Sequence, residues 1–284
     1  MEAMDLIKQL RSETGVSVMD CKRALDKAEN DIEKARVILK EEGLAKADKK
    51  AERETKAGAI AIYVSDDGKK GSIIEFRCET DFVAKNEEFI KLADEIAKIT
   101  CNTNPTNVDD LLQKTNENGE TVDGLIRNLV AKIGEKMEVA RFEIINTEGY
   151  LSSYIHAGNR LGVLLEMKAD QDIWSNDIAK ELIGDLSMQV AAMAPIAVVP
   201  EDLSEEDVKN VKEYIEEELT KENKPEEIKV KIREGRIQKR FSEICLSYQP
   251  FIKNDSLTIS KLLEEKGKEL NASINIVGFI RYQI

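Results

Sequence analysis

Few side chains in this 284-residue chain could carry out covalent chemistry. His156 is its single histidine, and the four cysteines, Cys21, Cys78, Cys101 and Cys245, lie far apart with no CxxC pair. The sequence therefore predicts neither a zinc site nor a redox dithiol, and no Cys/His or Ser/His pair is evident. It also contains no glycine-rich loop of the kinds that hold nucleotide phosphates. We predict a binding protein, not an enzyme, with no cofactor of its own.

A second feature is the run from Thr80 to Phe89, in which Phe82 follows Asp81 where a predicted strand gives way to a helix. Phe82 lies seven residues before Phe89, so it fits the same helical stripe and would pack in the core. Asp81 fits the N-cap of that helix, where its carboxylate would accept a backbone hydrogen bond. A Phe82 that points outward would instead form a contact site. Spacing alone leaves both alternatives open.

Composition limits the class of partner. The chain has 42 Lys and Arg against 55 Asp and Glu, a net charge of -13, which opposes attraction to a phosphate backbone. We therefore expect no nucleic acid as the main ligand. No apolar run approaches the length of a membrane span, and the N-terminus lacks a signal core, so we expect no membrane contact and a cytoplasmic location.

Residues 1–44 are expected to form a small three-helix domain. Apolar residues recur there at helical spacing, with a break at residues 14–17: Leu6, Leu10, Met19, Cys21, Ala24, Leu25 and Ala28. A third helix is predicted to begin at Asn30, as an N-cap with Glu33 three residues later, and to end at Gly43. Residues 45–57 are charged and alanine-rich, which predicts a solvated linker, helical in part.

The next part of the chain matches itself when shifted by 91 positions, residues 58–81 onto 149–172. Identical pairs in the two copies are Gly58/Gly149, Tyr63/Tyr154, Gly71/Gly162, Glu75/Glu166 and Asp81/Asp172. Each copy predicts two strands joined by a polar turn, and then a helix. The helical stripes are Phe89, Leu92, Ala93 and Ile96 in the first copy, and Ile178, Leu182, Leu186, Val190 and Met193 in the second. The pattern predicts a duplicated hairpin-plus-helix unit, with a further helical stretch at about 121–137.

Two amphipathic stretches at about 203–243 predict an antiparallel helical hairpin that projects from the body. The first begins at Ser204, and the sequence Asn223-Lys224-Pro225 separates it from the second, with Pro225 at a first helical position. The β-prone segment 274–282 is expected to return to a sheet.

Several of these motifs resemble the bacterial elongation factor Ts family, the nucleotide exchange factors of the translational GTPase elongation factor Tu. The resembling segments are spread in order over nearly the whole chain: Leu10–Gly15, Met19–Leu25, Thr80–Lys85, His156–Gly162, Gln249–Phe251 and Gly278–Arg281.

The resemblance implies an α+β fold with an N-terminal three-helix UBA-like (ubiquitin-associated-like) domain. A duplicated hairpin-plus-helix core would follow, as an N-subdomain at 58–146 and a C-subdomain at 147–284 that carries the inserted antiparallel helical hairpin. The hairpin would contact the partner or support a dimeric complex, and the sequence leaves both options open.

It further implies that the chain promotes GDP release from elongation factor Tu during protein biosynthesis, without catalysing bond chemistry. The tip residues Thr80, Asp81, Phe82 and Val83 would insert near the magnesium and phosphate site of the GTPase. Residues expected to contact the partner elsewhere are Arg11, Met19, Lys22 and His156.

Two other classes of function stay open at this point. The three-helix domain and its linker would suit a helix-binding or ubiquitin-binding adaptor. His156 among many carboxylates would suit a hydrolase, although an exposed turn histidine beside Tyr154 is the simpler interpretation.

The repeat favours an exposed tip, because Asp172 and Ile173 occupy the equivalent step of the second copy, without the aromatic residue.

Overall fold

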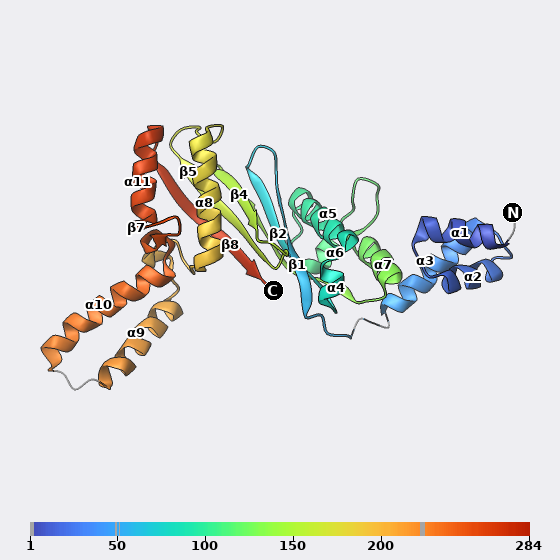
Figure 1. Cartoon of the computed structure of the whole chain (residues 1–284), viewed down its shortest axis with the longest axis horizontal. Coiled ribbons are helices and arrows are strands. Elements are labelled where there is room, and N and C mark those ends of the chain that lie inside the picture. The colour runs from blue at the N-terminus through green and yellow to red at the C-terminus, as the bar shows by residue number, and fades with distance from the viewer. Residues whose placement is uncertain (1–2, 49, 51, 222–224) are drawn as a thin grey trace.

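The computed structural model describes residues 3–48, 50, 52–221 and 225–284, and it has a mixed α+β architecture. Figure 1 shows an elongated molecule, with a group of helices at the N-terminal end, sheets with their covering helices in the middle, and a helical hairpin at the other end. None of the helices in the described part of the chain has the length and apolar composition of a transmembrane segment.

The N-terminal helices are α1 (Ala3–Thr14), α2 (Val18–Lys27) and α3 (Ile32–Asp48). Their shared core contains Leu10, Cys21 and Leu25, as the helical spacing predicts. The predicted cap of α3 is wrong, because the Asp31 carboxylate, not Asn30, accepts the first backbone N–H groups. Asn30 has a left-handed φ of 64° and belongs to the preceding turn.

The predicted end of this helix at Gly43 is also wrong, since α3 continues to Asp48 and includes part of the expected linker. Gly43 is buried where α3 packs against α7 (Val122–Ile133). A Cβ atom at Gly43 would lie 2.6 Å from Cβ of Ala131. Glycine is therefore required here for close helix packing, not for helix termination.

Gly43→Ala is expected to loosen this contact, although alanine favours a helix by about 1 kcal/mol over glycine. The new methyl group would overlap Ala131 and force α3 away from α7. The measurement is the rate of limited proteolysis between the three-helix domain and the first strand, which should rise. Adding Ala131→Gly to the same chain should restore the wild-type rate, and an unchanged rate in Gly43→Ala alone would contradict the assignment.

The first sheet has the order β1-β2-β3 and is antiparallel, with β1 (Ala57–Val64), β2 (Lys70–Cys78) and β3 (Met137–Asn146). Between β2 and β3 lie α4 (Asp81–Ala84), α5 (Glu87–Thr103), α6 (Val108–Gln113) and α7. The predicted stripe of α5 is buried as expected, in one apolar cluster with side chains of the sheet. Strand β3 and helix α6 were not among the predicted elements.

The second sheet has the matching order β4-β5-β8, with β4 (Tyr150–Ile155), β5 (Leu161–Ala169) and β8 (Ile274–Gln283). Its register shifts after Glu166, as that of the first sheet shifts after Glu75, at matched positions of the repeat. Helix α8 (Asp177–Met193) has the same length as α5 and also begins after an Asn cap. Met193 is an exception to the predicted stripe, because it ends α8 with its side chain exposed.

The two sheets pack against each other through Ile60, Ile73 and Tyr282. The matched glycines of the repeat lie at this interface. A Cβ atom at Gly162 would lie 2.5 Å from Ile60 Cγ2, and one at Gly71 would lie 3.0 Å from Leu151 Cδ1. Both positions therefore admit only a very small residue between the sheets.

A buried carboxylate lies in the first sheet. Glu75 is 1% exposed and accepts hydrogen bonds from Nε of Arg77 and Nε of Arg141, each at 2.6 Å. The Arg141 guanidinium also lies 3.9 Å above the ring of Tyr282, which comes from the second sheet. A buried carboxylate needs such partners, and the contact of Arg141 with Tyr282 links this network to the second sheet.

The predicted hairpin is formed by α9 (Glu205–Thr220) and α10 (Glu226–Ile244), and the Ser204 hydroxyl caps α9 as predicted. Pro225 is the residue before α10, not its first helical residue, while the predicted break at Asn223 and Lys224 lies outside the described residues. The short helix η1 (Pro200–Asp202) precedes the hairpin, and η2 (Leu246–Tyr248), β6 (Pro250–Phe251), β7 (Asn254–Thr258) and α11 (Ile259–Leu270) lead from it to β8.

Candidate functional site

Helix α4 carries an outward-pointing aromatic side chain. The chain leaves β2 at Cys78 and turns at Thr80, whose hydroxyl caps the four-residue helix by accepting from the Val83 N–H. One face of α4 buries Val83, which is 8% exposed, whereas Phe82 on the other face is 83% exposed. The alternative in which Phe82 continues the buried stripe of α5 is therefore wrong. The interruption between α4 and α5 breaks the helical phase on which that alternative depended.

The carboxylate of Asp81 is also outside the core. Because Thr80 is the cap, the alternative in which Asp81 caps the helix is wrong. Asp81 instead lies in the first turn of α4 and forms an exposed ion pair with Lys85, one turn later, at 3.4 Å. The tip thus presents an aromatic ring and a carboxylate side by side.

The base of the tip is held by groups distant in the sequence. The carboxylate of Glu135 accepts from the Thr80 backbone N–H at 3.0 Å and from its hydroxyl at 2.8 Å. Glu79 accepts from the Lys136 N–H at 2.6 Å, and this bond is the main reason that the pKa of Glu79 is lowered. The Cys78 thiol donates to the Thr80 carbonyl at 3.1 Å. The exposed tip is therefore attached to the rest of the first half by several hydrogen bonds at its base.

The four cysteines are buried, free thiols. Burial raises the pKa of Cys78 to about 12, and the nearby charge of Glu135 contributes to the same shift. Burial is also the main cause of the raised pKa of the other three thiols. Since the thiolate is the reactive form, these side chains are suited to packing and not to nucleophilic chemistry.

The equivalent step of the second half has a different structure. Ile173 is buried there, and the ring of Trp174 stacks on Tyr150 with centroids 5.1 Å apart. The chain passes from β5 to α8 without a counterpart of α4. The asymmetry predicted from the repeat is thus visible in the structure, where the first half exposes Phe82 and the second half buries Ile173 and partly buries Trp174.

His156 lies in the turn between β4 and β5, exposed to solvent. Its Nδ1 is 2.9 Å from the Tyr154 hydroxyl, as the alternation of the strand predicts. The same turn touches the first sheet, because the carbonyl of Asn159 accepts from the Ile60 N–H at 2.6 Å. His156 is therefore held at a defined position on a different element from the tip.

The remaining predicted contact residues lie on the three-helix domain. Arg11 is at the end of α1, and Met19 and Lys22 lie on α2, all with exposed side chains. Met19 is 72% exposed, and its neighbour Val18, which the sequence did not single out, is exposed as well. The predicted residues thus form three separate groups along the molecule, and the structure does not bring them into one pocket.

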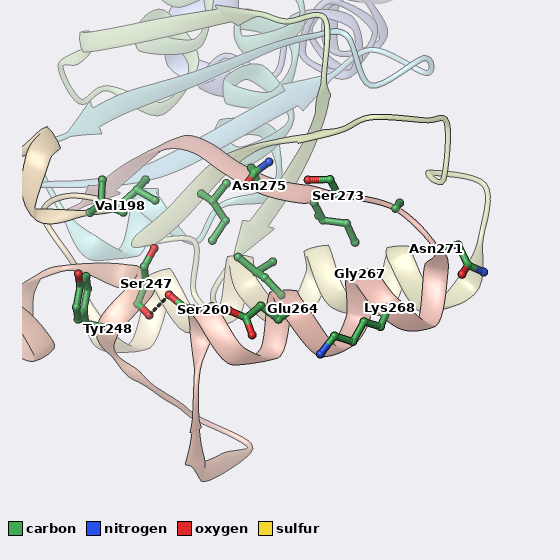
Figure 2. A pocket seen from close by; sticks show the side chains of 15 residues that line it. Val198, Ser247, Tyr248, Ser260, Glu264, Gly267, Lys268, Asn271, Ser273 and Asn275 are labelled. Carbon is green, nitrogen blue, oxygen red and sulfur yellow. Dashed lines mark hydrogen bonds between the residues drawn. The ribbon is translucent and has the colours of Figure 1, made fainter.

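The structure contains a cavity of about 810 Å³ away from these groups, between α11 and β8. Its lining includes Ser260, Glu264 and Lys268 of α11 and, on the opposite strand segment, Ser273 and Asn275 (Figure 2), and the Ser260 hydroxyl donates to the Ser247 carbonyl at 2.8 Å. None of the predicted site residues lines this cavity. Among the residues that the structure describes, no group of three or more His, Cys, Asp or Glu side chains could hold a metal ion.

Comparison with known proteins gives a consistent match. The family described as "Elongation factor TS" matches residues 79–284. "Elongation factor Ts" of Clostridium perfringens (strain SM101 / Type A) is 43% identical over 278 residues, which cover 98% of this chain and 91% of the relative. "Elongation factor Ts" of Aquifex aeolicus (strain VF5) is 43% identical over 289 residues, covering 99% and 97% of the two chains.

Proposed function

The chain belongs to the elongation factor Ts family, and from this membership we propose that it is the guanine nucleotide exchange factor that promotes GDP release from elongation factor Tu. It would act in translation elongation as a binding protein, with no cofactor of its own and no bond made or broken.

The observation that carries the proposal is the exposure of Phe82, 83%, on a helix whose base is fixed. A phenylalanine side chain can bury more than about 150 Å² in a contact. An exposed phenylalanine contributes this apolar area to binding when a partner covers it. A GTPase holds GDP through backbone N–H groups and a bridging Mg²⁺. We propose that the tip that enters this region of the GTPase consists of Thr80, Asp81, Phe82 and Val83. The Phe82 ring would stabilise an opened conformation of the GTPase nucleotide site.

One side chain does not supply the whole effect. Accelerating release by about 10⁴ requires roughly 5.5 kcal/mol of differential binding, whereas burying a phenylalanine contributes about 1.5–3 kcal/mol. We therefore propose that Arg11, Met19, Lys22 and His156 hold other faces of the partner. Their exposure on α1, on α2 and in the turn between β4 and β5 supports this division of roles. By linkage, GDP must weaken the binding of the exchange factor to elongation factor Tu by the same factor by which the exchange factor weakens the binding of GDP.

The finer description of the fold is part of the same proposal. We propose that α1, α2 and α3 form a UBA-like domain, that the α9–α10 hairpin is a coiled-coil insertion, and that the core arose by duplication. The common strand orders, matched register shifts and equal lengths of α5 and α8 support the duplication.

The test is stopped-flow release of a fluorescent GDP analogue from the cognate elongation factor Tu. We expect the release rate to rise with the concentration of this protein and then to saturate, since release within the complex becomes limiting. Unlabelled GDP in excess, without the protein, gives the spontaneous rate. A rate equal to the spontaneous one at every concentration would overturn the proposed function.

A further inference from the structure

The tip depends on one carboxylate that lies 55 positions further along the chain. Glu135 binds Thr80 with both oxygens: Oε2 accepts from the backbone N–H at 3.0 Å and Oε1 accepts from the hydroxyl at 2.8 Å. A carboxylate that receives two such bonds fixes both the backbone and the side chain of its partner. Glu135 therefore determines how Thr80, the residue that caps α4, is oriented.

The other polar atoms of Thr80 are committed as well. Its hydroxyl accepts from the Val83 N–H at 3.4 Å, while its carbonyl accepts from the Cys78 thiol at 3.1 Å and from the Ala84 N–H at 3.2 Å. A four-residue helix is too short to be stable alone, because nucleating a helix fixes several residues for one hydrogen bond. The conformation of α4, and with it the direction of Phe82, thus depends on what holds Thr80.

Glu135 is itself well placed to hold Thr80. It lies in the turn between α7 and β3, after Gly134, which ends α7 in the left-handed conformation at φ 89°. The next residue, Lys136, binds Glu79 through its backbone N–H at 2.6 Å, and Met137 is buried in the core of the first half. The Glu135 carboxylate therefore extends from a turn that is held on one side by the end of α7 and on the other by the contacts of Lys136 and Met137.

We propose that Glu135 is a positioning residue for nucleotide exchange: it sets the direction of Phe82 before the partner GTPase arrives. This inference rests on the proposed function, since it deepens the role of the same tip. A preorganised contact loses less conformational entropy when it forms, so fixing Thr80 raises the fraction of bound complexes in which the ring is inserted. Glu135 acts through Phe82 and need not touch the partner.

Glu135→Gln tests this, because the amide keeps the shape of the side chain but places an N–H₂ group against one of the two donors of Thr80. We expect the saturating rate of GDP release to fall about 10-fold, while the half-saturating concentration changes less than about 3-fold, because the other contacts still capture the partner. A variant that is merely partly unfolded would raise the apparent half-saturating concentration and would leave the saturating rate unchanged.

The decisive comparison repeats the substitution in a Phe82→Ala background. If Glu135 acts through Phe82, Glu135→Gln should lower the saturating rate less than about 2-fold there, since coupled residues are not additive. Equal losses in both backgrounds would overturn the proposal, as would a wild-type rate in the single Glu135→Gln variant.

A second readout does not depend on exchange activity. Amide hydrogen exchange of residues 79–85 should be faster in Glu135→Gln, with α5 unchanged, and unchanged protection at Thr80 would again overturn the proposal. The matched control is Glu117→Gln, which removes a carboxylate bound to Lys98 at 3.0 Å in another loop of the same half. If wild-type protein fails to accelerate release, the proposed function fails; if it succeeds and Glu135→Gln equals it, only the positioning role fails.

Discussion

Replacing Phe82 with alanine is expected to lower the saturating rate of GDP release by roughly 10- to 150-fold and to leave the melting temperature within about 1 °C of wild type. The side chain is 83% exposed, so its removal deletes almost no intramolecular packing. If the ring is buried in the partner, the lost transfer free energy is about 1.5–3 kcal/mol, and each 1.4 kcal/mol corresponds to a factor of ten. Stopped-flow release and thermal unfolding of the same preparations measure the two quantities.

The control for this prediction is Ile196→Ala, which also truncates an exposed apolar residue but lies beyond α8, near the hairpin. Its release rate at saturation should match wild type. A large fall in melting temperature for Phe82→Ala, with normal release per folded molecule, would show that the ring stabilises this protein and does not act on a partner.

Phe89→Ala is expected to have the opposite profile, a loss of about 3–5 kcal/mol in the free energy of unfolding of the first half. Phe89 is fully buried, and its ring stacks on Phe76 with centroids 4.5 Å apart. Removing it leaves a cavity between α5 and the sheet that neighbouring side chains fill only in part. Urea denaturation followed by circular dichroism measures the loss.

The control for Phe89 is Phe89→Leu, which keeps most of the apolar volume and should cost less than about half as much. Release per folded molecule should be preserved in both variants, because α4 remains attached through Thr80. A cost below about 1 kcal/mol for Phe89→Ala would contradict the assignment of Phe89 to the core. These two outcomes together would assign Phe82 to partner binding and Phe89 to the stability of the fold.

Much of the fold could be predicted because it is determined by local patterns in the sequence. Alternation and turn residues predict both β-hairpins, and the spacing of Phe89, Leu92 and Ile96 predicts the buried face of α5. The α9–α10 hairpin followed from two narrow apolar stripes. In each case the period of the pattern and the geometry of the element are set by neighbouring residues.

The remainder depends on contacts between distant segments. Gly43 is a helix stop by local criteria, yet α7 requires a small residue there and the helix continues. Nothing near Thr80 in the sequence indicates Glu135, because the two meet only when the turn after α7 returns to the end of β2. The outward position of Phe82 also has a local cause, because α4 ends at Ala84 and Asn86 caps α5, which breaks the helical phase on which the predicted stripe depended.

The matching strand orders of the two sheets have a consequence for synthesis on the ribosome. Strand β3 completes the first sheet soon after α7, whereas β8 completes the second only after α8, the hairpin and α11 have all been made. Because domains tend to fold as they emerge, the first half can close while β5 still lacks a neighbour on one edge. An unpaired edge is open to mispairing with other chains. The nascent chain is therefore most vulnerable to aggregation while its second half is being translated, with the tip of the first half already formed.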